Sequence, residues 1–199
     1  VMITTGTTTD TLKYTAGGVY RSAQLNGRNG FKYALKIQHG GKVVEAETEV
    51  PFTTTFQAGK LVLREEAPGD TAYYVEGVLT PRTGAVYGAT WSIIDGQTST
   101  VIEDTVLNTL VRERDKTQLG HLIIRTRNVP QQIIQQYRRS LYIRVHAFDE
   151  DFYNFFLTQD ANNASSNIFS QAGTGLRWNV TGDGIGMFLG KSDFLIRIP

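Results

Sequence analysis

The segment FKYALKIQHGGKVVEAETEVP, residues 31–51, decides the fold that the sequence predicts. Both halves alternate apolar with polar side chains, and this period of two is typical of a β-strand with one buried face. His39-Gly40-Gly41-Lys42 predicts a hairpin turn between the halves, and Pro51 ends the pairing because proline has no N–H to donate. The residues expected on the buried face are Phe31, Tyr33, Leu35, Ile37, Val44, Ala46, Thr48 and Val50.

The remainder of the chain carries further strand patterns. Between Ala85 and Ile93 the odd positions are expected to line one face, and Asp95-Gly96 predicts a two-residue hairpin turn. Residues 52–59 are interpreted as a linker, and residues 103–120 as irregular with one helical turn near 107–112. Further strands are expected at 60–64, 72–79, 98–102, 122–126, 141–148 and 194–198.

Two short helices are predicted. Residues 131–139 follow Pro130 and place apolar side chains at helical spacing. Residues 150–159 follow Asp149, which is a good N-cap, and begin with two acidic residues that the helix dipole favours.

These patterns predict a mainly β protein of two domains. Residues 1–52 are expected to form a partial immunoglobulin- or transthyretin-like β-sandwich domain, and residues 60–199 a larger antiparallel β domain with a short helix near 150–159. Four strands before residue 52 fall short of the roughly seven of such a sandwich. Because Val1-Met2-Ile3 also reads as mid-strand, we expect upstream sequence that holds any targeting or lipid-attachment segment.

Composition narrows the classes of function. The 199 residues are 40% apolar, enough for a sizeable core. Twenty Lys and Arg against 19 Asp and Glu argue against a broad nucleic-acid surface. The chain has no cysteine, which excludes disulfides and thiolate zinc sites.

No catalytic, cofactor-binding or metal-binding residue is predicted. His39, His121 and His146 are too far apart in sequence for a zinc-binding HExxH face, and no G-x-S-x-G serine occurs. The acidic residues 149–151 are explained by helix capping, while a glycosidase pair that meets only in space stays an open, less favoured alternative. The segment GDGIGMFLG, residues 182–190, departs from the dinucleotide fingerprint, so its glycines are expected to permit turns, bulges or close backbone approach.

Aromatic residues are the best candidates for binding. Phe152, Phe155 and Phe156 can form one helical stripe, for which core packing is the default and a partner-docking patch the alternative. The residues predicted as partner or ligand contacts are Trp91, Trp178, Phe152 and Tyr153.

Several short motifs occur in a characteristic order. They are GVYRS (18–22), YALKI (33–37), VVEAETEVP (43–51), LYIRVHAFDEDFYNFFLTQ (141–159), SSNI (165–168) and GDGIGMFLG (182–190). In these motifs the chain resembles an uncharacterised family of Bacteroidetes outer-membrane lipoproteins, a domain of unknown function often encoded beside TonB-dependent receptors. The lipidated cysteine expected of such a protein is absent from this sequence, which truncation would explain.

The resemblance implies a lipid-anchored outer-membrane protein without established catalytic residues. We therefore expect a non-enzymatic cell-envelope lipoprotein, an accessory or binding component of an outer-membrane transport or surface assembly. Its expected partner is an outer-membrane protein such as a TonB-dependent receptor, with a glycan or peptide as a further possible ligand and no cofactor. The alternative is a glycan-binding or adhesive β-sandwich module that uses Trp91 or Trp178 for stacking.

Overall fold

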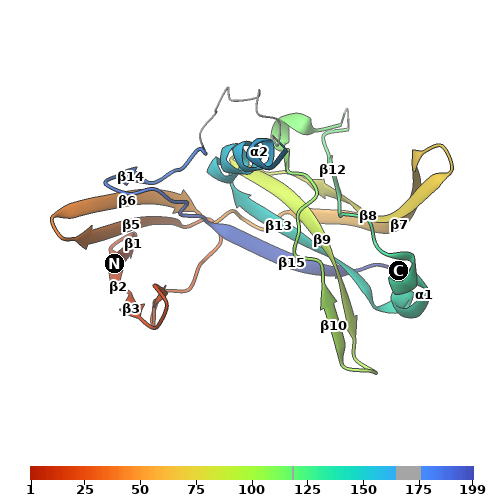
Figure 1. Ribbon diagram of the computed structural model, residues 1–199, viewed down its shortest axis with the longest axis horizontal. Coiled ribbons are helices and arrows are strands. Elements are labelled where there is room, and N and C mark those ends of the chain that lie inside the picture. The colour runs from red at the N-terminus through yellow and green to blue at the C-terminus, as the bar shows by residue number, and fades with distance from the viewer. Residues whose placement is uncertain (118, 165–175) are drawn as a thin grey trace. The chain divides into compact units, whose positions relative to one another are not determined.

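A computed structural model describes residues 1–117, 119–164 and 176–199 (Figure 1). Of the residues that the structure describes, 51% lie in strands and 12% are helical, and the several antiparallel sheets confirm the predicted mainly β class. The SSNI motif at 165–168 lies outside the described residues. In the described part of the chain, no helix is long and apolar enough to span a membrane.

The chain forms two compact units, and each is built from two separate segments. Unit 1 comprises Val1–Pro51 and Phe148–Lys191, and unit 2 comprises Phe52–Ala147 and Ser192–Pro199. The predicted division into domains 1–52 and 60–199 stays a prediction. A late segment therefore completes the unit that the first 51 residues begin.

Unit 1 is organised by an antiparallel sheet of five strands (Figure 1). A small hairpin accompanies it, formed by β3 (Lys13–Tyr14) and β4 (Tyr20–Arg21). In spatial order the five strands are β14 (Thr181–Gly182), β6 (Lys42–Glu49), β5 (Lys32–His39), β1 (Met2–Thr5) and β2 (Thr8–Thr11).

The β5–β6 hairpin confirms the interpretation of residues 31–51. The strands pair from Lys32↔Glu49 to His39↔Lys42. On β6, Ala46 and Thr48 are buried while Glu47 is exposed, as the alternation predicts. Phe31 differs, because it precedes β5 and is exposed, with the Arg28 guanidinium 6.0 Å from its ring centroid.

The glycine-rich segment 182–190 runs directly along β6, which confirms the predicted close backbone approach. A Cβ at Gly190 would overlap the carbonyl of Glu49, and a Cβ at Gly184 would lie 2.7 Å from Val44 Cγ2. Gly182 has φ +90°, a conformation that L side chains rarely adopt.

Helix α2 (Asp151–Ala164) starts one residue later than predicted and extends beyond 159. Asp149 Oδ1 accepts a hydrogen bond from the Asp151 N–H at 3.3 Å, which agrees with its predicted capping role.

Unit 2 contains a sheet of five strands and a sheet of three strands (Figure 1). In the larger sheet, four strands lie side by side and the fifth pairs with part of one of them. The four strands are, in order, β10 (Thr100–Glu103), β9 (Ala85–Asp95), β13 (Leu141–Asp149) and β15 (Lys191–Arg197), and β11 (Val111–Arg112) also pairs with β9. The three strands are β12 (Leu122–Arg125), β8 (Asp70–Thr80) and β7 (Thr55–Ala67). Helix α1 (Gln131–Tyr137) confirms the helix predicted after Pro130, and the 3₁₀ turn η2 (Arg138–Ser140) follows it.

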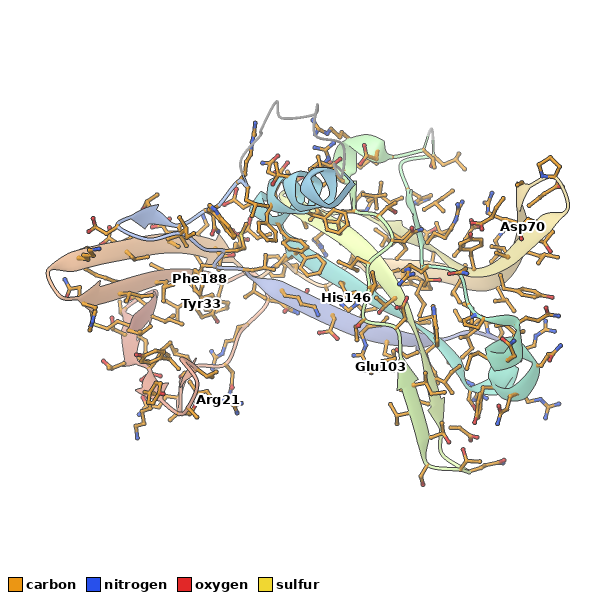
Figure 2. All side chains as sticks on the ribbon, in the orientation of Figure 1. Arg21, Tyr33, Asp70, Glu103, His146 and Phe188 are labelled. Carbon is orange, nitrogen blue, oxygen red and sulfur yellow. The ribbon has the colours of Figure 1, made fainter. Side chains whose placement is uncertain are left out.

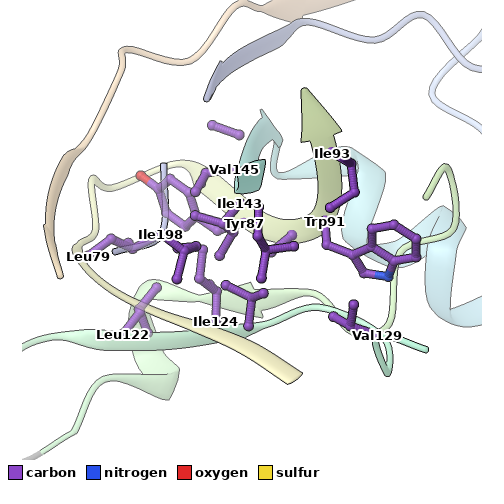
Figure 3. Close-up of a cluster of buried hydrophobic side chains, with 14 of the residues drawn as sticks. Leu79, Tyr87, Trp91, Ile93, Leu122, Ile124, Val129, Ile143, Val145 and Ile198 are labelled. Atoms are coloured by element: carbon purple, nitrogen blue, oxygen red, sulfur yellow. The ribbon is translucent and has the colours of Figure 1, made fainter. Parts of the chain in front are cut away.

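The core of unit 2 gathers buried side chains from both sheets (Figure 3). The odd positions of β9 from Ala85 to Ile93 all lie in this core, as predicted, and β13 contributes Leu141, Ile143, Val145 and Ala147. The even positions of β9 from Val86 to Ser92 are buried as well, which alternation alone did not predict. At Gly88 a Cβ would come within 3.0 Å of Leu107 and Leu110, so the segment after β10 closes over this second face.

Three local predictions in unit 2 were wrong. Residues 52–59 are not a linker throughout, because β7 begins at Thr55 and packs the Phe56 ring against Phe194. The turn after β9 has four residues, since the Asp95 carboxylate accepts hydrogen bonds from Gln97 N at 3.0 Å and Thr98 Oγ1 at 2.8 Å. Residues 107–112 end in β11, and the 3₁₀ turn η1 (Glu113–Asp115) comes only afterwards.

Candidate functional site

An apolar groove lies on the sheet of unit 1. It consists of a hollow of about 580 Å³ and an adjoining one of about 240 Å³. The two hollows share Ile3, Leu12, Tyr20 and Phe188. Leu35 and Ile37 of β5 line the larger hollow, so the half-buried face predicted from their alternation lines the groove.

One wall of the groove comes from the segment between β2 and β5. Tyr20 lies on this wall, and its ring meets Tyr14 edge-on with centroids 5.5 Å apart. Ser22 holds the turn that follows: its hydroxyl donates to the Asp10 carboxylate and accepts from Gln24 N at 3.0 Å and Leu25 N at 2.6 Å. This wall is therefore fixed by hydrogen bonds of its own.

The other wall is Phe188, from the segment that follows β14 (Figure 2). The Asn179 side chain clamps its backbone, because Nδ2 donates to the Phe188 carbonyl at 2.7 Å and Oδ1 accepts from the Phe188 N–H at 2.8 Å. Asn179 Nδ2 also lies 3.3 Å from the Glu47 carbonyl of β6, which connects this wall to the sheet.

Two polar side chains that line the smaller hollow are engaged in structural hydrogen bonds. The Tyr33 hydroxyl accepts from Arg28 N at 2.9 Å and donates to the Asn26 carbonyl at 3.1 Å. The Thr48 hydroxyl donates to Asp149 Oδ2 at 2.8 Å and accepts from Gly190 N at 2.6 Å. These two polar groups are therefore hydrogen-bonded within the fold, and most of the other side chains that line the groove are apolar.

The four residues predicted as contacts lie elsewhere. Trp91 is 7% exposed in the core of unit 2, so its ring presents no face on which a sugar could stack (Figure 3). Trp178 is half-buried in unit 1 with its ring centroid 5.2 Å from that of Phe155. Phe152 and Tyr153 are half-buried on α2, and Phe152 stacks on Phe155 at 6.0 Å, the packing that was the default expectation.

The three histidines do not assemble a site. His39 is exposed at the end of β5 and lines the larger hollow. In unit 2, His121 Nδ1 lies 3.1 Å from Gln57 Nε2, and His146 Nε2 lies 3.0 Å from the Thr90 hydroxyl (Figure 2). Within the described ranges, no group of three or more His, Asp or Glu residues could hold a metal ion.

Buried charge in unit 2 has a structural explanation. Glu76 is 6% exposed, and one of its carboxylate oxygens accepts hydrogen bonds from Arg64 and Arg125. Arg144 bridges Asp193 at 3.0 Å and Glu103 at 2.6 Å, and these partners, Asp193 foremost, raise the pKa of its guanidinium. The Glu76 cluster has two arginines for one carboxylate, and the Arg144 cluster has one arginine for two carboxylates, so each of these charged groups has a partner of opposite charge.

Sequence reasoning missed the groove because its walls come from distant parts of the chain. The alternation of β5 indicated an apolar face. Tyr20 and Phe188 belong to two of the short motifs, GVYRS and GDGIGMFLG. No local pattern brings those two residues to the same face.

Comparison with known proteins gives no further guide: no family model, curated protein or solved structure matches this chain. The geometry therefore defines a class only, a mainly β protein with an apolar groove on one of its sheets.

Proposed function

We propose that this protein binds a partner protein through the groove of unit 1 and is not an enzyme. In this proposal it is a lipid-anchored component of the cell envelope, an accessory of an outer-membrane transport or surface assembly. The partner is an outer-membrane protein such as a TonB-dependent receptor, which inserts a short segment with apolar side chains.

One observation carries the binding part of the proposal. The groove is lined by apolar side chains on a hydrogen-bonded frame, while Tyr33 and Thr48 are occupied within the fold. Each large apolar side chain that a partner buried in the groove would contribute about 1.5–3 kcal/mol to the free energy of binding, before the free-energy cost of association is subtracted. A frame held by Asn179 and Ser22 limits that cost, because the walls are ordered before binding.

The envelope location rests on the resemblance of the motifs at 18–22, 43–51, 141–159 and 182–190. A rigid β scaffold that displays a contact surface suits an accessory subunit. A glycan-binding module is the second candidate, and it now depends on Trp178, whose half-buried ring is the more accessible of the two tryptophans.

The test compares a groove variant with a matched surface variant in the full-length protein. Tyr20→Asp places a charge on the groove wall, at a residue 45% exposed, and Val101→Asp places the same charge on β10, at a residue 65% exposed. The protein is isolated from membranes with its bound partner, and affinity for that purified partner is measured by titration. Tyr20→Asp should weaken binding about tenfold or more, while Val101→Asp should leave it unchanged.

Equal affinities for the wild type and Tyr20→Asp would contradict the role of the groove. Isolation without an outer-membrane partner would contradict the accessory function. A fluorescence response of the tryptophans to a glycan panel, lost in Trp178→Ala, would favour the glycan-binding alternative.

A further inference from the structure

One stretch of the sequence, most of it in unit 2, is rich in basic residues. Residues 116–148 contain no aspartate and no glutamate. The same stretch contains six basic residues besides two histidines, namely Lys116, Arg125, Arg127, Arg138, Arg139 and Arg144. Although the net charge of the whole chain is nearly neutral, this stretch of sequence has an excess of positively charged residues.

Three exposed arginines gather where η2 meets the end of β15. Arg138 and Arg139 belong to η2, and Arg197 is the last residue of β15. Arg197 donates from Nε at 3.0 Å and from Nη2 at 2.7 Å to the Arg139 carbonyl. This bond holds the Arg197 guanidinium beside η2 and leaves its other N–H donors for a further acceptor. We call these three residues the arginine patch.

The arginine patch has no carboxylate partner among the residues that the structure describes. On β15 the carboxylate of Asp193 is bound by Arg144, which also binds Glu103. The patch therefore keeps a positive charge that the fold does not neutralise.

The adjacent helix α1 adds uncharged hydrogen-bonding groups. Its four exposed glutamines can both donate and accept hydrogen bonds, as sugar hydroxyls do. They are Gln131, Gln132, Gln135 and Gln136. The apolar residues of α1 point the other way, since Ile134 is 8% exposed within the core and Ile133 packs against that core.

We propose that the arginine patch and the glutamines of α1 bind a soluble acidic polysaccharide. The arginines pair with its carboxylate or phosphate groups, because the guanidinium fork matches their geometry. The glutamines hydrogen-bond its hydroxyl groups. This surface belongs to unit 2 and the groove to unit 1, and the proposal does not depend on the function proposed above.

A lipid bilayer and an acidic peptide fit the surface less well. Binding at a bilayer interface calls for exposed apolar side chains beside the basic ones, and the isoleucines of α1 are directed inward. An acidic peptide would use the arginines but would leave the row of carboxamides without hydroxyl partners. The test below measures binding to an acidic peptide and to lipid vesicles as comparisons.

The test measures binding of polygalacturonate to the full chain at low ionic strength, with neutral dextran, polyglutamate and phosphatidylglycerol vesicles as comparisons. The wild type should bind polygalacturonate in preference to all three. The triple variant Arg138→Gln, Arg139→Gln, Arg197→Gln should bind it about ten- to a hundredfold more weakly. A control variant removes equal charge elsewhere, by changing Lys32, Lys42 and Arg114 to Gln, and should stay within about twofold of the wild type.

The double variant Arg138→Gln, Arg139→Gln keeps the Arg197 hydrogen bonds and guards against loss of folding, which thermal unfolding also monitors. It should lose part of the affinity with an unchanged melting temperature. The proposal is overturned by three results: no binding of polygalacturonate, an equal loss in the control variant, or tighter binding to polyglutamate or to the vesicles.

Discussion

The carboxylate of Asp149 accepts a 2.8 Å hydrogen bond from the hydroxyl of Thr48, a residue 101 positions earlier in the chain. The same oxygen accepts from the Glu49 N–H at 2.7 Å, and the other oxygen accepts from Asp151 N. One side chain thus fixes the end of β6 and the start of α2. It is one of several links between the second segment of unit 1 and the first, beside the pairing of β14 with β6.

Asp149→Asn should therefore destabilise unit 1. An amide can replace only part of a carboxylate that accepts from several donors, so we expect a loss of about 1–3 kcal/mol in the free energy of unfolding, measured by urea titration. Glu47→Gln, which makes the same charge change at an exposed position of β6, is the control and should have almost no effect. Equal effects in the two variants would contradict the role given to Asp149.

Substitutions at two glycines of the segment 182–190 should differ sharply in their effect on stability. Gly190→Ala places a Cβ into the Glu49 carbonyl, and the backbone of β6 must shift to make room. Gly186→Ala adds the same methyl group where the nearest atom, Val180 Cγ2, is 3.6 Å away. Gly190→Ala should lower the melting temperature by several degrees and disturb the Phe188 wall, while Gly186→Ala should leave it nearly unchanged. A tolerated Gly190→Ala would show that the segment does not lie against β6 as described.

Local pattern in the sequence predicted much of this fold, for identifiable reasons. The hairpin at 31–51 was predictable because β6 buries only one face, which preserves strict alternation. The start of β7 was not, because Phe56 and Ala58 lie on either side of a register shift that interrupts the period of two. The second buried face of β9 escaped prediction because Leu107 and Leu110, which cover it, belong to a segment without strand or helix periodicity.

The candidate site was less predictable than the fold. Tyr20 and Phe188 are separated by most of the chain, and only the packing of 148–191 with the first 51 residues brings them to one groove. Trp91 was expected at a binding surface, but its place in the alternation of β9 puts it inside, which was the stronger signal. The glycines at 182–190 did indicate close backbone contact, but not which strand they contact.

The ion-pair cluster around Glu76 predicts unequal effects for its partners. Glu76→Gln leaves Arg64 and Arg125 without their shared carboxylate, so we expect a loss of about 1–3 kcal/mol in the free energy of unfolding. Arg64→Gln should cost less, about 0–1 kcal/mol, because Arg64 is half-exposed and Arg125 still neutralises the buried carboxylate. Chemical unfolding of both single variants and the double variant measures the coupling, and additive effects would contradict a shared network.

Tyr87 should make unfolding depend on alkaline pH. Its side chain is fully buried, and burial raises the pKa of its hydroxyl above the usual value, against the smaller opposing effect of the hydrogen bond from Arg82 N at 2.9 Å. The unfolded chain therefore ionises this group first. Its contribution to stability is fully present below pH of about 10 and is lost as the pH rises toward the folded-state pKa.

Tyr87→Phe removes this ionisation together with the hydrogen bond. Near pH of about 8 the variant should be less stable than the wild type by about 0.5–1.5 kcal/mol, the value of one hydrogen bond. Above pH of about 10 the wild type should lose stability faster, so the difference should narrow. Urea unfolding at several pH values measures it, and Tyr14→Phe, at a residue 61% exposed, should show no such narrowing. A constant difference across the alkaline range would mean that the phenol ionises equally in the folded and unfolded chain, and that its burial does not hold it protonated.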